Sequence, residues 1–417
     1  DMFWCGMNGD NHEWWECHFA PQNAGLCFYH FELRTSRGHF VLKKDIGGEA
    51  RAGGSEDWQL TAYSADFKTP EWLAGGVLYQ IFPDRFYCSG REKHDIPYGR
   101  TMHADWSEQP EWRPNAEGKI TNTDFFGGDL KGIEQKLGYL KSLGVTCIYL
   151  NPIFESHSNH RYDTANYEKI DPLLGTEEDF RSLCAAAKAR GIRILLDGVF
   201  SHTGSDSIYF NREGRYGDGG AYRSQQSPYY PWYSFRSWPN DYECWWNFTT
   251  LPNVREGNPD YDAYINGENG IIHRWLAAGA SGWRLDVADE LPDCFLDSLN
   301  RAVKGFDEDA VVLGEVWEDA SNKTAYGVRR RYLMGGQLDS VMNYPFRDAI
   351  LGFLRGEHAS LMMDRIETIA ENYPPQVLDI LMNHIGTHDT ERALTVLGGE
   401  PAGERGRAWQ SEQHMTP

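Results

Sequence analysis

The stretch GWRLDVADE, residues Gly282 to Glu290, decides the fold. It begins as an apolar strand and ends in acidic residues. Side chains two positions apart in a strand point to the same face, so Arg284 and Asp286 are expected to lie together. A guanidinium beside a carboxylate lowers the pKa of that carboxylate and keeps it ionised. Taken alone, the pair is better explained as a buried structural ion pair, and the surrounding strands decide whether it does more.

Apolar segments of the same kind recur along the chain and alternate with helical patterns. We expect strands at 77–82, 145–150, 192–196, 282–286, 311–314, 338–342 and 378–383, and helices at 132–143, 177–190 and 271–278. Continuous apolar strands alternating with helices indicate a parallel sheet buried on both faces. The sequence therefore predicts an α/β protein with a (β/α)₈ barrel whose eighth strand is missing from this chain. A doubly wound sheet is the alternative, but the Gly-rich phosphate turn that often marks it is absent from the sequence.

The residues before the barrel have a different pattern. Tyr29, Phe31 and Leu33 alternate with polar residues, which predicts one half-buried strand through them, and strand-like segments follow at 39–43 and 58–63. We expect an incomplete N-terminal β-sandwich-like domain at 1–72 and a catalytic barrel at 73–417.

Two further segments of the chain have distinctive compositions. Residues 202–260 are rich in Gly, Pro, Tyr and Trp and too long for a connector, so they are expected to form an inserted loop subdomain. Residues 398–417 are polar and strand-poor. The chain is therefore expected to be a fragment of a longer protein or to be completed by another chain.

The composition excludes some classes of partner. The chain has 417 residues and a net charge of -21, which argues against nucleic acid and against an anionic membrane surface. Aromatic residues make up 14% of the chain, which fits either a sugar-binding surface or an aromatic-rich core. The eight cysteines form no CxxC pair or metal-like cluster, so a reducing, cytoplasmic location is expected. The sequence has no apolar run long enough to span a membrane.

Polar residues recur where the expected strands end. Asp197 and His202 come at and after the end of the third strand, and Arg284 and Asp286 lie in the fourth. Glu315 and Trp317 follow the fifth strand, and His388 and Asp389 follow the seventh. In a barrel these ends meet at one rim, where active sites lie, and helix caps alone do not explain such a set. Several carboxylates without a metal cluster or an activated Ser or Cys indicate acid–base and carboxylate-nucleophile chemistry. Glycoside hydrolysis needs that combination.

These segments resemble the four sequence regions of the α-amylase superfamily, whose members are retaining α-glucan hydrolases and transglycosylases. The resemblance runs from about Gly76 to Asp389. It implies that Asp286 is the nucleophile, Glu315 the general acid/base and Asp389 a third carboxylate that binds sugar hydroxyls. The substrate-binding residues that it implies are Tyr162, Asp197, His202, Arg284 and His388, with Glu290 and Trp317 on the acceptor side.

Within the superfamily, the chain is most similar to the neopullulanase, cyclomaltodextrinase and maltogenic amylase group, including amylopullulanase-type enzymes. The N-terminal β domain, the segment LYQIFPDRF at 78–86 and the segment MNYP at 342–345 carry this similarity. It implies hydrolysis or transglycosylation of maltooligosaccharides, cyclodextrins, pullulan or starch, and a homodimer in which the N-terminal domain covers the partner's cleft. The alternative is a non-catalytic carbohydrate-binding or interaction protein on the same fold, against which the presence of all three carboxylates argues.

The resemblance also implies two calcium sites, but no other cofactor. At the first, Ser201 stands where the superfamily usually has an asparagine, so we expect no calcium there. The second would take ligands from the loop after the first strand, Cys88 to Asp95, where two cationic side chains stand in place of hard oxygen ligands. Gly127 and Asp129 remain candidate ligands, and the sequence leaves this second site open.

Overall fold

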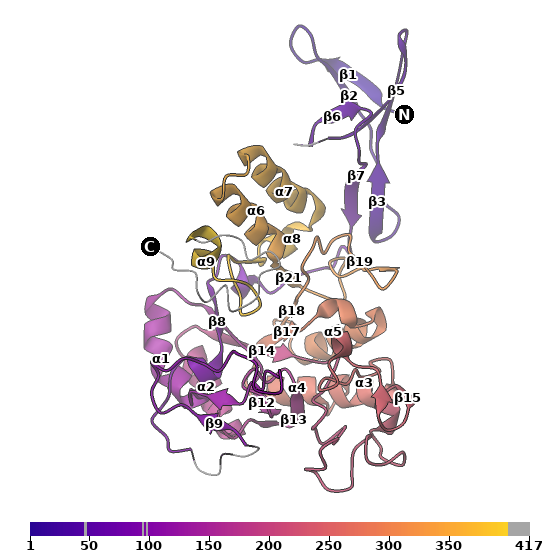
Figure 1. The fold of residues 1–417 in the computed structure, drawn as a ribbon. Coiled ribbons are helices and arrows are strands. Elements are labelled where there is room, and N and C mark those ends of the chain that lie inside the picture. Colours follow the sequence, from indigo (N-terminus) through magenta and orange to yellow (C-terminus); the bar gives the residue numbers. More distant parts are fainter. Residues whose placement is uncertain (46–47, 94–95, 97–98, 399–417) are drawn as a thin grey trace.

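The computed structural model describes residues 1–398 except 46–47, 94–95 and 97–98. Its centre is a parallel sheet in the spatial order β22-β21-β18-β17-β14-β11-β8 (Figure 1). These strands are β8 (Leu78–Ile81), β11 (Cys147–Leu150), β14 (Arg193–Gly198), β17 (Gly282–Leu285), β18 (Val311–Gly314), β21 (Ser340–Asn343) and β22 (Met382–Asn383). The spatial order follows the chain order, as successive β/α units of a barrel require, so the predicted α/β barrel architecture is confirmed.

Helices surround this sheet. They are α1 (Leu130–Ser142), α2 (Glu177–Lys188), α3 (Pro259–Asn266), α4 (Ile271–Ala277), α5 (Asp293–Phe306), α6 (Tyr344–Leu354), α7 (Ala359–Asn372), α8 (Pro375–Leu378) and α9 (Ala393–Gly398). Their starts follow from local sequence: Asp129 caps α1 by accepting from the Gly132 N–H, and Thr176 forms a capping box with Asp179 at α2. None of the described helices is long and apolar enough to cross a membrane.

The main core lies between the helices and the outer face of the sheet. Trp275 of α4 and Trp283 of β17 are fully buried there, and the Phe154 ring lies 5.1 Å from that of Trp275. A second cluster fills the inside of the barrel and includes Tyr149 and Leu313. Burying both faces explains why the sheet strands are continuously apolar in the sequence.

Pairs of short strands lie in the loops that connect the main strands and helices. They are β9 (Thr101–Met102) with β10 (Asp124–Phe125), β12 (Phe154–Ser156) with β13 (Thr164–Ile170), β15 (Phe235–Ser237) with β16 (Asp241–Tyr242), and β19 (Thr324–Ala325) with β20 (Val328–Arg329). The β15–β16 pair lies in the long segment after β14. Within that segment, His202 bridges to Asn253, so its end folds back onto its start.

The N-terminal region is strand-rich, as predicted. Its strands are β1 (Phe3–Met7), β2 (Glu13–Glu16), β3 (Gly25–Tyr29), β4 (Phe31–Thr35), β5 (Gly38–Lys44), β6 (Ala50–Ala52) and β7 (Trp58–Ala62). The single strand expected through Tyr29 and Leu33 is wrong, because the chain changes partners at His30. Before His30, β3 pairs with β7, and after His30, β4 pairs with β5.

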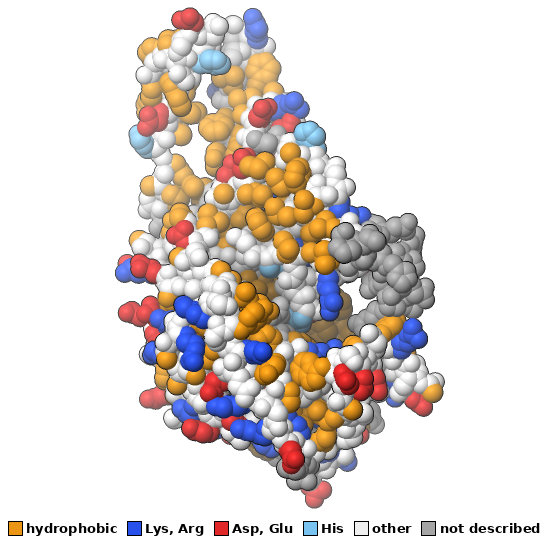
Figure 2. Space-filling view, turned by 90° about the vertical axis from the view of Figure 1, so that its left-hand side faces the viewer, with side chains coloured by type: hydrophobic (Ala, Val, Ile, Leu, Met, Phe, Trp, Pro, Cys, Tyr) orange, Lys and Arg blue, Asp and Glu red, His pale blue; other side chains and the backbone are white. Residues whose placement is uncertain are grey.

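None of the described residues before Pro70 is buried, so the small sheets enclose no core of their own. Figure 2 shows hydrophobic side chains gathered over the upper part of one face, where this region lies. The exposed ones include Phe3, Trp4, Trp14 and Trp15. Contacts to the barrel come from the base of the region, where Lys44 pairs with Glu371 of α7 at 2.6 Å.

The strand expected at 378–383 is only partly correct. Residues Pro375–Leu378 form α8, and the strand is limited to Met382–Asn383. Pro375 occupies the first helical position, where its fixed φ favours a helical turn over a strand. Ile380, which follows α8 without being in a strand, is buried in the cluster inside the barrel that also includes Leu73 and Tyr149.

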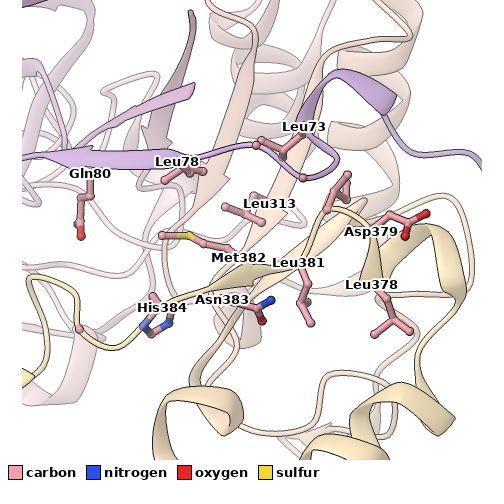
Figure 3. A pocket seen from close by; sticks show the side chains of 14 residues that line it. Leu73, Leu78, Gln80, Leu313, Leu378, Asp379, Leu381, Met382, Asn383 and His384 are labelled. Atoms are coloured by element: carbon pink, nitrogen blue, oxygen red, sulfur yellow. The ribbon is translucent and has the colours of Figure 1, made fainter. Parts of the chain in front are cut away.

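The sheet has two edges, β22 and β8. A cavity lies between them and is lined from both sides, by Leu78 and Gln80 of β8 and by Met382 and Asn383 of β22 (Figure 3). Among the described residues, no further strand pairs with either edge. Residues 399–417, which were expected to be strand-poor, lie outside the described part of the chain.

Candidate active site

Three neighbouring strands, β14, β17 and β18, bring acidic residues to one rim of the sheet. The register pairs Asp197 at the end of β14 with Arg284 of β17, and Leu285 of β17 with Gly314 of β18. Asp286 and Glu315 each follow their strand by one residue, so they emerge at the same level, two residues beyond Asp197. Parallel strands place their carboxyl ends together, which explains this convergence.

One arginine contacts three of the predicted carboxylates. Nη1 of Arg284 lies 2.9 Å from Oδ1 of Asp197 and 2.8 Å from Oδ1 of Asp286, and Nη2 lies 2.9 Å from Oε2 of Glu315. The Arg284 side chain is fully buried, and the carboxylates are nearly so. Arg284 therefore ties together the ends of β14, β17 and β18.

A single guanidinium cannot neutralise three carboxylates. Burial raises the pKa of Asp286 well above its ordinary value; Glu315 and Asp197 raise it further, while Arg284 lowers it. Burial likewise raises the pKa of Asp197. The expectation that the arginine alone keeps Asp286 ionised is thus incomplete, because burial and the neighbouring acids oppose it. The cluster binds protons more readily than separate carboxyl groups would.

Both oxygens of Glu315 are held by donors. The backbone N–H of Val287 donates to Oε2 at 2.7 Å, and Nε1 of Trp317 donates to Oε1 at 3.1 Å. Val287 has φ 37° and ψ 60°, a left-handed conformation that is rare for a β-branched residue. This strained backbone turns the N–H after Asp286 towards the carboxylate on the next strand.

Two tyrosines donate to Asp197 from the opposite side. Tyr149 of β11 and Tyr162 both contact Oδ2, with the Tyr162 hydroxyl at 2.8 Å. The Tyr162 ring stacks on His388, with centroids 5.4 Å apart and planes 6° from parallel. Nε2 of His388 lies 2.6 Å from Oη of Tyr162, so residues far apart in the chain form one network.

Asp389 lies on the more open side of this network. Its Oδ2 is 3.2 Å from Nε2 of His388, and its side chain is 36% exposed. Burial and the negative charge of Glu315 raise the pKa of Asp389 to about 6. The structure therefore places the third predicted carboxylate within electrostatic range of Glu315 and Asp197.

Of two further predicted residues, Trp317 contacts one of the three carboxylates around Arg284, whereas His202 contacts the backbone of Tyr162. His202 is buried, with Nε2 3.1 Å from the Tyr162 carbonyl, and its ring stacks on Trp245. Trp317 is half-exposed and stacks on Tyr344, with ring centroids 4.1 Å apart.

Glu290 lies on the short turn Ala288–Glu290 after the Asp286 strand. Its Oε1 is 2.5 Å from the Tyr326 hydroxyl, so its partner belongs to the β19–β20 connection rather than to the three carboxylates.

The structure adds residues to the site that the sequence reasoning missed. They are Gln80, Tyr149, Asn151, Val287 and Tyr344. The hydroxyl of Tyr149 near the end of a buried strand was a usable signal, because a buried tyrosine needs a partner for that group.

Asp129, one of the two candidate calcium ligands, is paired with a lysine and does not fit a calcium ion. Nζ of Lys93 lies 2.6 Å from Oδ2 of Asp129 and donates to the Leu173 carbonyl at 2.8 Å. Oδ1 of Asp129 accepts from the Gly132 N–H at 2.6 Å. The Lys93 ammonium thus supplies the positive charge at this carboxylate, and a divalent cation beside it would be repelled. Gly127 contributes its N–H to Asp84, at 3.1 Å.

No group of three or more His, Cys, Asp or Glu side chains arranged for a metal ion occurs in the part of the chain that the structure describes. At the superfamily's other calcium position, where no calcium is expected, the Ser201 hydroxyl is hydrogen-bonded to Nδ1 of His202 at 3.0 Å.

Known proteins resemble both the sequence and the fold. A family model described as the alpha amylase catalytic domain matches residues 80–412. The chain is 40% identical to an amylopullulanase of Thermoanaerobacterium saccharolyticum over 439 residues, covering 93% of this chain and 33% of that protein. It is 37% identical to neopullulanase 2 of Thermoactinomyces vulgaris over 378 residues, covering 90% and 60%. A cyclomaltodextrinase structure superposes with a TM-score of 0.68 at 28% identity, covering 95% of this chain and 64% of that one. The chain spans less than two thirds of the length of both curated relatives.

Proposed function

We propose, because this chain belongs to the alpha-amylase family, that it hydrolyses the α-glucosidic bonds of α-glucans with retention of anomeric configuration. The names of its relatives indicate pullulan and cyclodextrins as substrate classes, and maltooligosaccharides and starch contain the same linkages. Because the chain spans only part of those relatives, this activity is proposed for the protein to which the chain belongs.

The observation that carries the proposal is the bridge that Arg284 makes between Asp286 and Glu315, at 2.8 Å and 2.9 Å. Two carboxylates that contact the same guanidinium are close together. Retaining glycosidases need a separation of roughly 5–5.5 Å between their two carboxyl groups, whereas inverting enzymes need a wider gap for a water molecule. The bridge supports the closer arrangement.

The proposed reaction has two steps. In the first, Asp286 attacks the anomeric carbon while Glu315 donates a proton to the glycosidic oxygen of the departing sugar. Oδ1 of Asp286 is held by Arg284, so we assign the attack to Oδ2. In the second, Glu315 removes a proton from water, which attacks the same carbon and releases Asp286. Two inversions leave the product with the original α configuration.

The surrounding residues are assigned to sugar binding. We assign Tyr162 as the platform under the sugar being cleaved, Asp389 and His388 as partners of its hydroxyls, and Asp197 and His202 as residues that hold this platform. The parallel stacking of Tyr162 on His388 and the donors around Asp197 support these roles. Aromatic faces stack well on sugar rings, because the C–H groups of the sugar face the electron-rich π surface of the aromatic ring.

Trp317 and Glu290 are assigned to the acceptor side. Trp317 is half-exposed while its N–H contacts Glu315, so an incoming acceptor could pack on its ring beside the proton donor. A sugar bound there in place of water would make the second step a transglycosylation. The proposed activity therefore includes transglycosylation as well as hydrolysis.

Turnover of β-cyclodextrin and maltotetraose tests the proposal, with Glu315→Gln as the inactive variant. The α anomer is expected as the first product in proton NMR, and loss of turnover is expected in the variant. A first product with the β configuration would contradict retention. A non-catalytic carbohydrate-binding protein would instead bind these sugars without cleaving them, in the chain and in its longer parent alike.

A further inference from the structure

Gln80 joins the site from the edge of the sheet. It lies on β8, and its side chain projects into the space between the two sheet edges (Figure 3). Its Nε2 lies 3.1 Å from Oδ1 of Asn151 and 2.5 Å from Nδ1 of His388. Gln80 is thus linked to Asp197 by three hydrogen bonds in series, through Asn151 and Tyr162, and touches none of the three carboxylates that share Arg284.

The hydrogen bonds of this network have one consistent direction. The amide nitrogen of Gln80 has two hydrogens, one for Asn151 and one for His388. Asn151 then donates from Nδ2 to Oη of Tyr162 at 3.0 Å, and Tyr162 donates to Oδ2 of Asp197 at 2.8 Å. Nδ1 of His388 must accept, so the ring hydrogen lies on Nε2, which is 2.6 Å from Oη of Tyr162.

The reverse orientation of both amides leaves groups unsatisfied. If Gln80 presented its oxygen, His388 would carry its hydrogen on Nδ1, and the bare Nε2 would face the Asp389 carboxylate at 3.2 Å. Two acceptors in contact repel each other. The single hydroxyl hydrogen of Tyr162 would also have to serve Asn151 as well as Asp197. When the amide nitrogens of Gln80 and Asn151 face His388 and Tyr162, each of these hydrogen-bonding groups has a partner.

We propose that Gln80 is a positioning residue that holds His388 as the neutral Nε2–H tautomer, so that the ring directs its one donor towards Tyr162 and Asp389. The effect of this on turnover rests on the proposed function, whereas the state of the ring does not. Burial, Arg284 and His160 lower the pKa of His388 to about 3, so the ring is neutral near pH 7 and its tautomer matters. The charged or titratable groups that face the ring are Arg284, His160, Tyr162 and Asp389.

Two substitutions separate this role from packing. Gln80→Glu keeps the shape of the side chain but replaces the amide donor with a carboxylate, which draws a hydrogen onto Nδ1 of His388. Gln80→Met fills similar space without a hydrogen-bonding group, so Nε2–H remains the form favoured by Asp389. A packing role predicts that the isosteric Glu is the milder change. The tautomer role predicts that Glu is the more damaging one.

The direct test is ¹⁵N NMR of the histidine rings at pH 7, with the His388 signals assigned by their loss in His388→Asn. We expect Nδ1 of His388 to be unprotonated in the natural chain and in Gln80→Met, and protonated in Gln80→Glu. An Nδ1–H tautomer in the natural chain would overturn the inference, even if neither variant folded. An unchanged ring in a folded Gln80→Glu chain would overturn it equally.

Turnover of β-cyclodextrin provides the second readout. We expect kcat to fall on the order of 10²-fold in Gln80→Glu and roughly 10-fold or less in Gln80→Met, because partners that orient a functional histidine typically matter by such factors. Equal losses, or a larger loss in Gln80→Met, would contradict a tautomer role. If the natural chain and its longer parent show no turnover, the proposed function fails while the ring spectrum still decides this inference.

Discussion

Nη2 of Arg284 lies 2.9 Å from Oε2 of Glu315, although the two residues come from different strands. The local sequence pairs Arg284 with Asp286 only, two positions along the same strand. The contact across to β18 means that one fully buried cation fixes the relative position of both proposed reacting groups. It also means that a change at Arg284 alters the acid/base as well as the nucleophile.

Arg284→Lys should therefore impair catalysis strongly. A lysine keeps the charge but presents one ammonium in place of a planar fork, so it cannot contact three carboxylates at once. We expect kcat on β-cyclodextrin to fall on the order of 10²-fold or more. Arg274→Lys is the matched control, because Arg274 makes a half-exposed pair with Glu177 at 2.7 Å. Retention of more than half of the activity in Arg284→Lys would contradict the bridging role.

Lys93→Met should destabilise the fold. The change removes the ammonium from a pair whose lysine side chain is 12% exposed and whose Asp129 is 3% exposed. Leaving a buried carboxylate without its partner costs on the order of 3 kcal/mol, which a thermal melt resolves. Lys131→Met is the control, since Lys131 makes a more exposed pair with Glu134 on α1.

The same melts test the calcium question. With Lys93 in place, the melting temperature of the natural chain should be the same in 5 mM calcium and in excess EDTA, at roughly constant ionic strength. A rise of several degrees with calcium, reversed by EDTA, would show that a metal ion competes with Lys93 at Asp129.

Glu256→Gln should stabilise the protein increasingly as the pH rises. Burial, with a contribution from Glu290, raises the pKa of Glu256 from 4.5 to about 8 in the fold. A raised acid pKa means that the folded state binds the proton more tightly than the unfolded chain does. Stability is therefore lost between about pH 4.5 and pH 8 as the unfolded chain ionises first.

The side-chain amide introduced by Glu256→Gln does not ionise, so the variant avoids this loss. We expect the two chains to melt alike near pH 4.5 and to differ on the order of 1–3 kcal/mol at pH 8. Urea melts at the two values measure the difference. A gap that stays constant with pH would mean that Glu256 ionises as freely in the fold as in the unfolded chain.

The barrel could be predicted from sequence because each strand and helix carries its own signal. Continuous apolar strands such as Val311–Gly314 and capped helices such as the one after Thr176 are local features, and the structure has them where expected. The strand at 378–383 failed because an apolar run does not distinguish a buried turn of helix from a strand, and Pro375 favours the helix. The break at His30 was not predicted, because alternation of apolar and polar residues does not show which strand each half pairs with.

Part of the site could be predicted for the same reason. Asp197, Arg284, Asp286 and Glu315 stand at strand ends, and parallel strands bring such ends together. The roles of Gln80, Tyr149 and Lys93 depend on contacts between segments that are far apart in the sequence, and spacing carries no information about these. The sequence left the second calcium site open, because the pairing of Lys93 with Asp129 appears only in three dimensions.

The central claim is that Asp286 forms a covalent bond to the sugar, and a trapping experiment tests it most directly. The Glu315→Gln chain is incubated with α-maltosyl fluoride, whose fluoride leaves without a proton from the enzyme, and the products are analysed by mass spectrometry. We predict a maltosyl adduct on the peptide that contains Asp286, formed because the second step lacks its base, and no adduct in Asp286→Asn. Fluoride release without an adduct on that peptide, or an adduct on another carboxylate, would contradict the account.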